Sequence, residues 1–266
     1  MDQQRLVQTA QALVAEGKGI LAADESGGTI KRRFDSINVE STEKTRRDYR
    51  EMLFRTAGVS DFISGVILFD ETIRQEGADG TPLVKVLSDQ GMIPGIKVDK
   101  GTIPLPEAPD ELVTEGLDGL RDRLNEYAEL GAGFTKWRAV IDIADDTPTP
   151  YGLNANAHSL ARFAALSQEA GLVPIVEPEI LRDGGHSIER CFEVTEETLR
   201  EVFDQLAQQK VLLEGMLLKP SMVISGGSAG QRAEPENVAN MTIECFKRVL
   251  PSAVPGVVFL SGGEPD

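Results

Sequence analysis

The sequence predicts an α/β protein, and within that class a TIM (β/α)8 barrel with seven of its eight strands present. Short apolar segments recur roughly 40 residues apart, and amphipathic helical patterns lie between them. Such alternation is typical of βα units, which build parallel sheets. The seven predicted strands are Gly19–Asp24, Gly65–Asp70, Ile93–Asp99, Phe134–Val140, Val173–Ile180, Glu214–Pro220 and Gly256–Gly263.

A barrel is favoured over a doubly wound sheet because no Gly-x-Gly-x-x-Gly motif follows the first strand and no P-loop sequence is present. A barrel needs eight strands, and the sequence ends at Asp266, directly after the seventh. We therefore expect residues 1–266 to form a single barrel domain that is incomplete at its C-terminus. A missing strand would leave two sheet edges unpaired.

Helical patterns fill the intervals between the predicted strands. A stripe formed by Leu117, Leu120, Leu124 and Tyr127 predicts one helix, and Leu160 and Phe163 begin another that Gly171 ends. Thr195 is the expected N-cap of a helix that carries Leu199 and Val202, and Pro235–Leu250 form a further helix. Cys245 lies on the apolar face of that last helix, so we expect a buried, unreactive thiol.

Composition excludes several function classes. The formal net charge of −16 disfavours nucleic acid and anionic membrane surfaces as partners. Two histidines make a histidine-rich zinc centre hard to build, so no metal is expected. No apolar segment approaches the roughly 18 residues of a membrane helix, and the N-terminus does not resemble a signal peptide. A cytoplasmic protein is the default expectation.

Charged residues follow the apolar core of five predicted strands. In a barrel these strand ends meet at one mouth, which brings together Asp24, Lys97, Lys136, Glu177 and Lys219. Because side chains alternate along a strand, Lys97 and Asp99 share a face, as do Lys136 and Arg138, and Glu177 and Glu179. A ring of structural salt bridges would explain any single pair. Repetition over five strands favours a functional site, since buried charge is costly unless it is paired or used.

Two kinds of chemistry suit this mouth. A lysine is a nucleophile only when neutral, and desolvation and neighbouring cations lower a lysine pKa. Lys219 follows an apolar segment near Lys136 and is the best Schiff-base candidate. Phosphate binding is the second function. Ser261 and Gly262 end the seventh strand, where barrels often bind phosphate, although a plain turn is the alternative. Candidates for a second phosphate site are Ser26, Thr29, Arg33, Lys97 and Arg138.

Several of these segments resemble one family, the class I fructose-bisphosphate aldolases. The resemblance is carried in order by Gly19–Ser26, Gly95–Gly101, Lys136–Arg138, Val173–Ile180, Leu213–Pro220 and Phe259–Gly263. It implies a (β/α)8 barrel assembled as a homotetramer. It also implies reversible cleavage of fructose 1,6-bisphosphate to dihydroxyacetone phosphate and glyceraldehyde 3-phosphate in glycolysis and gluconeogenesis, with no metal and no cofactor.

The resemblance also implies a role for each site residue. Lys219 attacks the C2 ketone, Glu177 helps to expel water from the carbinolamine, and Asp24 takes the C4 hydroxyl proton. Lys136 holds charge between Asp24 and Glu177, and Glu179 supports Lys219. Ser261 and Gly262 would bind the C1 phosphate. The C6 phosphate would lie near Ser26, Thr29, Arg33, Lys97 and Arg138.

The C-terminus departs from the family pattern. The eighth strand, its phosphate-binding arginine and a mobile tail have no counterpart within the 266 residues. A truncated, non-catalytic chain with a binding role is therefore the alternative function, and transaldolase-like exchange is a third. Residue patterns leave three matters open: the preference among ketose mono- and bisphosphates, the oligomeric state, and the choice between cytosol and plastid.

Overall fold

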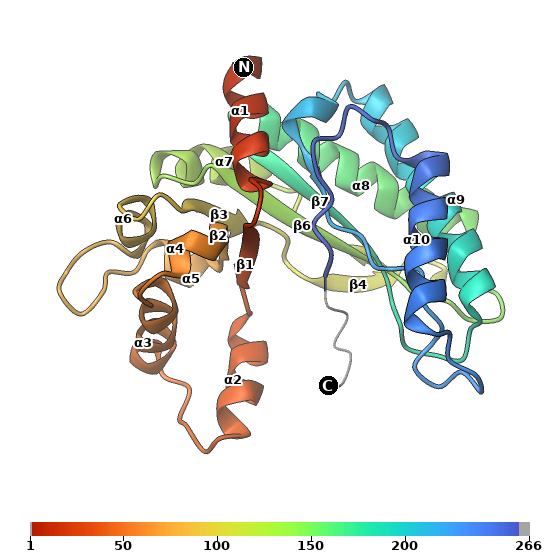
Figure 1. The fold of residues 1–266 in the computed structure, drawn as a ribbon, viewed down its shortest axis with the longest axis horizontal. Coiled ribbons are helices and arrows are strands. Elements are labelled where there is room, and N and C mark those ends of the chain that lie inside the picture. Colours follow the sequence, from red (N-terminus) through yellow and green to blue (C-terminus); the bar gives the residue numbers. More distant parts are fainter. Residues whose placement is uncertain (1, 261–266) are drawn as a thin grey trace.

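A six-stranded parallel sheet organises the computed structural model, which describes residues 2–260. The strand order is β1-β2-β3-β6-β7-β8, and every neighbouring pair is parallel. The strands are β1 (Gly19–Ala23), β2 (Ile63–Leu68), β3 (Ile93–Lys97), β6 (Phe134–Ile141), β7 (Val173–Ile180) and β8 (Leu217–Leu218). The sheet follows the chain order with helices outside it, as in a TIM barrel (Figure 1).

Long helices cover the outer face of the second half of the sheet. They are α8 (Pro150–Glu169), α9 (Ile188–Gln208) and α10 (Pro235–Val249); α8 and α9 pack on β7, and α10 packs beside α9 (Figure 1). Trp137 of β6 stacks on Phe163 of α8 with ring centroids 5.6 Å apart, and both side chains are fully buried. This interface belongs to an apolar core that extends from Ala23 to Cys245.

The predicted seventh strand is present in the described residues only as a single parallel bridge. Val257 pairs with Leu218. The Leu218 amide donates to the Gly256 carbonyl at 3.3 Å, and the Val258 amide donates to the Leu218 carbonyl at 2.9 Å. The α/β class and a TIM-barrel-like sheet are thus confirmed, whereas a regular seventh strand is not. The end of the predicted segment, Ser261–Gly263, lies outside the described residues.

A helix that the sequence patterns did not predict fills the amino-terminal end of the sheet. Leu6, Ala10 and Leu13 of α1 (Gln3–Leu13) are buried and join a second apolar cluster inside the sheet. Its partners there are Ile67, Phe134, Val173, Ile175 and Leu217, from four different strands. The apolar side chains of α1 therefore replace solvent at the end of the sheet opposite the charged strand ends.

An antiparallel hairpin between β3 and α7 (Leu120–Glu129) was also missed. Its strands are β4 (Thr102–Leu105) and β5 (Ala108–Thr114). Glu111 of β5 is buried and accepts hydrogen bonds from the Thr149 backbone amide, at 2.9 Å, and from the Thr149 hydroxyl. Thr149 caps α8, so the hairpin is tied by a carboxylate to the start of that helix. A negative charge at this helix N-terminus also interacts favourably with the helix dipole.

Shorter helices complete the fold: α2 (Gly27–Asp35), α3 (Glu43–Phe54), α4 (Val59–Phe62), α5 (Asp70–Ile73), α6 (Leu83–Ser88) and α7 (Leu120–Glu129), together with the 3-10 turn η1 (Leu213–Gly215). The predicted helices around Leu124, Leu160 and Val238 are confirmed as α7, α8 and α10. Cys245 is fully buried, and burial raises the pKa of its thiol to about 12. The expectation of a buried, unreactive thiol is thus supported.

The predicted N-cap Thr195 is wrong. The N-cap of α9 is Ser187, eight residues earlier in the chain, whose side chain accepts from the Arg190 amide. Thr195 lies inside the helix with 2% of its surface exposed and donates to the Cys191 carbonyl at 2.7 Å. A buried threonine can satisfy its hydroxyl with the carbonyl four residues back, so a polar residue before an apolar stripe need not be a cap.

Replacement of Gly95 by alanine should destabilise the fold. A Cβ atom at Gly95 would lie 2.3 Å from Cζ of the buried Phe134 ring. We expect the free energy of unfolding to fall by about 1–3 kcal/mol, as for other overpacked cores, in urea titrations. Gly19→Ala is the matched control, because nothing lies within 4 Å of its Cβ position in the same sheet. Equal stability of the two variants would contradict the packing described.

Candidate active site

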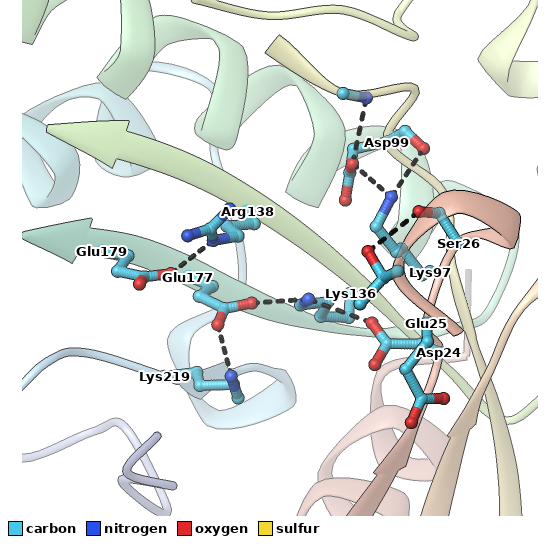
Figure 2. Close-up of polar contacts among 12 residues, drawn as sticks. Asp24, Glu25, Ser26, Lys97, Asp99, Lys136, Arg138, Glu177, Glu179 and Lys219 are labelled. Carbon is cyan, nitrogen blue, oxygen red and sulfur yellow. Dashed lines mark hydrogen bonds and ion pairs between the residues drawn. The ribbon is translucent and has the colours of Figure 1, made fainter. Parts of the chain in front are cut away.

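Charged side chains gather at the carboxyl ends of the parallel strands. Asp24 follows β1, Lys136 and Glu177 lie within β6 and β7, and Lys219 follows β8. A cavity of about 980 Å³ opens there, and its walls include Asp24, Lys97, Lys136, Arg138 and Glu177. The convergence that the sequence predicted at one mouth is therefore confirmed for these residues (Figure 2).

Lys136 is the central cation of the cluster. Its Nζ lies 3.1 Å from Asp24 Oδ2 and 2.9 Å from Glu177 Oε2, and 8% of its side chain is exposed. Burial by itself lowers the pKa of Lys136, but the charges of Glu177 and Asp24 outweigh burial and raise the pKa overall. Lys136 therefore stays an ammonium ion and neutralises two carboxylates that would otherwise repel each other.

Glu177 is shared between two lysines. One carboxylate oxygen pairs with Lys136, and the other accepts a short hydrogen bond from Lys219 Nζ. Only 3% of the Glu177 side chain is exposed, so both contacts lie in a largely desolvated environment. The Lys219 amide donates to the Val176 carbonyl at 2.8 Å, which fixes the lysine backbone beside β7. Figure 2 shows Lys219, Glu177, Lys136 and Asp24 in one connected series.

Two further ion pairs flank this series. Lys97 Nζ donates to Asp99 Oδ1 at 2.6 Å, and Arg138 Nε donates to Glu179 in a short hydrogen bond. The predicted same-face pairing of Lys97 with Asp99 is confirmed. The contact of Glu179 goes to Arg138, whereas the family resemblance implied that Glu179 supports Lys219. The reason is register, because Arg138 of β6 pairs with Glu177 of β7 and leaves Glu179 within reach of the arginine side chain.

Ser26 and Thr29 lie at the start of α2 (Gly27–Asp35), and Arg33 lies in its last turn. The Ser26 and Thr29 hydroxyls are 3.2 Å apart, and Ser26 is the N-cap residue but makes no capping bond with its side chain. The first amides of α2 are thus left without that partner, which suits an anion. Arg33, on the same helix, forms an ion pair with Glu25. Ser261 and Gly262 lie outside the described residues.

Two residues with structural roles at the site were missed by the sequence analysis: Glu25 and Arg50. Asp99 was placed on the same face as Lys97 but was given no role at the site. Arg50 had no signal in the sequence, because it lies on α3, far along the chain, and is fully buried. Within residues 2–260, no group of three or more His, Cys, Asp or Glu side chains is arranged to hold a metal ion. In the same range, no helix is long and apolar enough to cross a membrane.

A parallel, barrel-type sheet with its reactive side chains at the carboxyl strand ends defines a TIM-barrel-type enzyme. The sequence matches the family Fructose-bisphosphate aldolase class-I over residues 5–266. The chain belongs to the class I fructose-bisphosphate aldolases, which the residue patterns had indicated.

Relatives agree over nearly the whole chain. It is 58% identical over 266 residues to the "Probable fructose-bisphosphate aldolase class 1" of Xanthomonas campestris pv. campestris, covering 100% of this chain and 80% of that protein. It is 51% identical to "Fructose-bisphosphate aldolase 4, cytosolic" of Arabidopsis thaliana, covering 98% and 66%. A Plasmodium falciparum aldolase, solved with TRAP and a small-molecule inhibitor, superimposes with a TM-score of 0.96 at 50% identity, covering 98% and 76%.

Removal of the central cation should destabilise the protein. Lys136→Met leaves Asp24 and Glu177 facing each other without the ammonium ion between them. We expect the free energy of unfolding to fall by about 3–5 kcal/mol, the usual cost of breaking a buried ion pair from one side, in urea titrations near neutral pH. Lys85→Met is the control, because its pair with Asp89 is exposed and should contribute less than about 0.5 kcal/mol. Similar losses in the two variants would refute the central role of Lys136.

Proposed function

We propose that this chain cleaves fructose 1,6-bisphosphate reversibly through a Schiff base on Lys219. The arrangement of Glu177 between the ammonium groups of Lys219 and Lys136, with Asp24 on the far side of Lys136, is the observation that carries the proposal. Such a series combines an amine nucleophile, a proton carrier beside it, a fixed cation and a second carboxylate.

The first half of the reaction forms the imine. Transfer of a proton from Lys219 to Glu177, along the hydrogen bond that joins them, leaves a neutral amine. The amine nitrogen forms a bond to the C2 carbonyl carbon, and the proton that the nitrogen then loses is transferred to the carbonyl oxygen to give a carbinolamine. Glu177 then donates its proton to the carbinolamine hydroxyl, which leaves as water, and the C2–nitrogen bond becomes an iminium.

The second half breaks the carbon–carbon bond. Asp24 removes the proton of the C4 hydroxyl while Lys136 stabilises the developing negative charge on that oxygen. The C3–C4 electron pair moves into the iminium to give an enamine, and glyceraldehyde 3-phosphate leaves. Protonation at C3 and hydrolysis of the resulting iminium release dihydroxyacetone phosphate and regenerate Lys219.

Two anion sites at opposite ends would hold a bisphosphate. The C6 phosphate is assigned to the start of α2 with Ser26, Thr29 and Arg33, together with Lys97 and Arg138. The C1 phosphate is assigned to Ser261 and Gly262. Support for the first site comes from the uncapped helix start and the arginine beside it. Glu179, which binds Arg138, is assigned the role of orienting that arginine.

Borohydride reduction in the presence of dihydroxyacetone phosphate should attach one adduct to Lys219, detected by mass spectrometry of proteolytic peptides. Lys136 is an internal control, because its raised pKa keeps it charged and therefore non-nucleophilic. Lys219→Ala should take up no label and lose cleavage activity. An active protein that stays unlabelled at Lys219, and whose activity EDTA abolishes, would refute the proposal. Turnover in a coupled cleavage assay would exclude a purely binding role.

We further propose that the chain forms one barrel domain, acts in the cytoplasm and assembles as a homotetramer. The continuous apolar core supports a single domain, and the cytosolic relative from Arabidopsis supports the location.

Light scattering coupled to size-exclusion chromatography should give four times the mass of the monomer, and a monomer mass would contradict assembly. Closure of the barrel by a further strand stays a prediction, which the intact mass of the native protein checks.

A further inference from the structure

Glu25 connects the proposed phosphate site to a buried cation. Its carboxylate, 8% exposed, forms an ion pair with Arg33, whose side chain is 61% exposed at the mouth. On the inner side lies Arg50 of α3, which is fully buried. Arg50 Nη2 donates to the Glu25 backbone carbonyl at 2.8 Å and lies 3.7 Å from Glu25 Oε2. One carboxylate thus lies between two guanidinium groups, one solvated and one buried.

The inner contact is incomplete. Among the residues that the structure describes, Glu25 Oε2 and the Arg50 atoms Nε and Nη1 have no hydrogen-bond partner. Buried polar atoms without partners are rare and costly, and a guanidinium normally binds a carboxylate through two hydrogen bonds. Burial lowers the pKa of Arg50, while the charges of Glu25 and Glu71 oppose that effect and Arg46 adds to it. Arg50 is therefore short of negative charge beside a carboxylate that is oriented toward Arg33.

We propose that Glu25 is an exchangeable counter-ion: it holds Arg33 while the site is empty and transfers to Arg50 when a substrate phosphate binds Arg33. This inference rests on the proposed function, which assigns the C6 phosphate to Arg33. The exchange has a physical reason. A phosphate that takes Arg33 leaves a carboxylate almost without solvent, and this carboxylate needs another cation nearby. Closing the 3.7 Å gap to Arg50 Nη2 supplies one and also gives Glu25 Oε2 the hydrogen-bond partner that it lacks.

The exchange would place Glu25 and Arg50 as positioning residues. Glu25 follows Asp24 and precedes Ser26 (Figure 2), so a shift of its side chain acts on a segment that carries a proposed catalytic carboxylate and a proposed phosphate ligand. Arg50 anchors that segment from α3 through the Glu25 carbonyl. Phosphate binding at α2 would therefore tighten the contact between α3 and the end of β1.

Crystal structures of the protein with and without fructose 1,6-bisphosphate, trapped on Lys219 by cyanoborohydride, test the exchange directly. In the adduct we expect Arg33 on the C6 phosphate and Glu25 within about 3.0 Å of Arg50. An adduct in which Arg33 still binds Glu25, or in which Glu25 does not approach Arg50, overturns the inference while leaving the Schiff base intact. Failure to form any adduct on Lys219 refutes the proposed function instead.

Kinetics on two substrates provide a second test. Glu25→Gln removes the charge that competes for Arg33, so KM for fructose 1,6-bisphosphate should fall about two- to fivefold, the range of one partly exposed ion pair. KM for fructose 1-phosphate, which lacks the C6 phosphate, should change less than about twofold. Arg50→Gln removes the second partner of Glu25 and should raise KM for the bisphosphate but not for the monophosphate.

Arg46→Gln is the matched control on α3. Arg46 pairs with Glu71 through hydrogen bonds of 2.6 and 2.8 Å, and its other hydrogen bonds go to Ser41. The Arg46→Gln variant should be less stable, but its KM values for the bisphosphate and for the monophosphate should change by similar factors. If Glu25→Gln and Arg50→Gln change KM for both substrates equally, or in the same pattern as Arg46→Gln, the two residues have only a structural role and the exchange is refuted.

Discussion

The sharing of one buried carboxylate by two lysines is the interaction on which this site depends. Glu177 contacts Lys136 on one side and Lys219 on the other with almost no solvent between them. Lys136 also contacts Asp24, so two acids and two amines form a compact group of low net charge. A group of this kind tolerates burial that any single member would not. It also keeps a proton acceptor beside an amine.

The parallel sheet positions these groups by register. Lys136 pairs with Ile175, and Arg138 pairs with Glu177, so alternate residues of β6 and β7 face the cavity at successive heights. In the short β8, Leu218 pairs with Val176. Lys219 is the next residue and therefore lies at the same height as Glu177. Backbone pairing therefore fixes distances between charged side chains that are more than 40 residues apart in the sequence.

The sequence predicted the charged residues of the site better than the elements and residues that hold them in place. Charge after an apolar strand is a local pattern, so Asp24, Lys97, Lys136, Glu177 and Lys219 were recognised one strand at a time. Arg50 carries no such pattern, since its burial depends on how α3 packs against the end of β1. The β4–β5 hairpin was missed because its alternation is weak and two of its residues, Pro104 and Pro109, are poor strand formers. Thr195 was assigned as a cap because a cap and a buried internal threonine look alike in sequence.

The apolar helix α1 packs at the amino-terminal end of the sheet, opposite the charged strand ends. Leu6, Leu13 and Phe134 fill that end within the described residues, and the cavity lined by charged side chains opens at the other end. In the mechanism proposed above, one half of the substrate stays bonded to Lys219 while the other departs. That covalent bond sets an order of release, with the aldehyde leaving first and the ketone last.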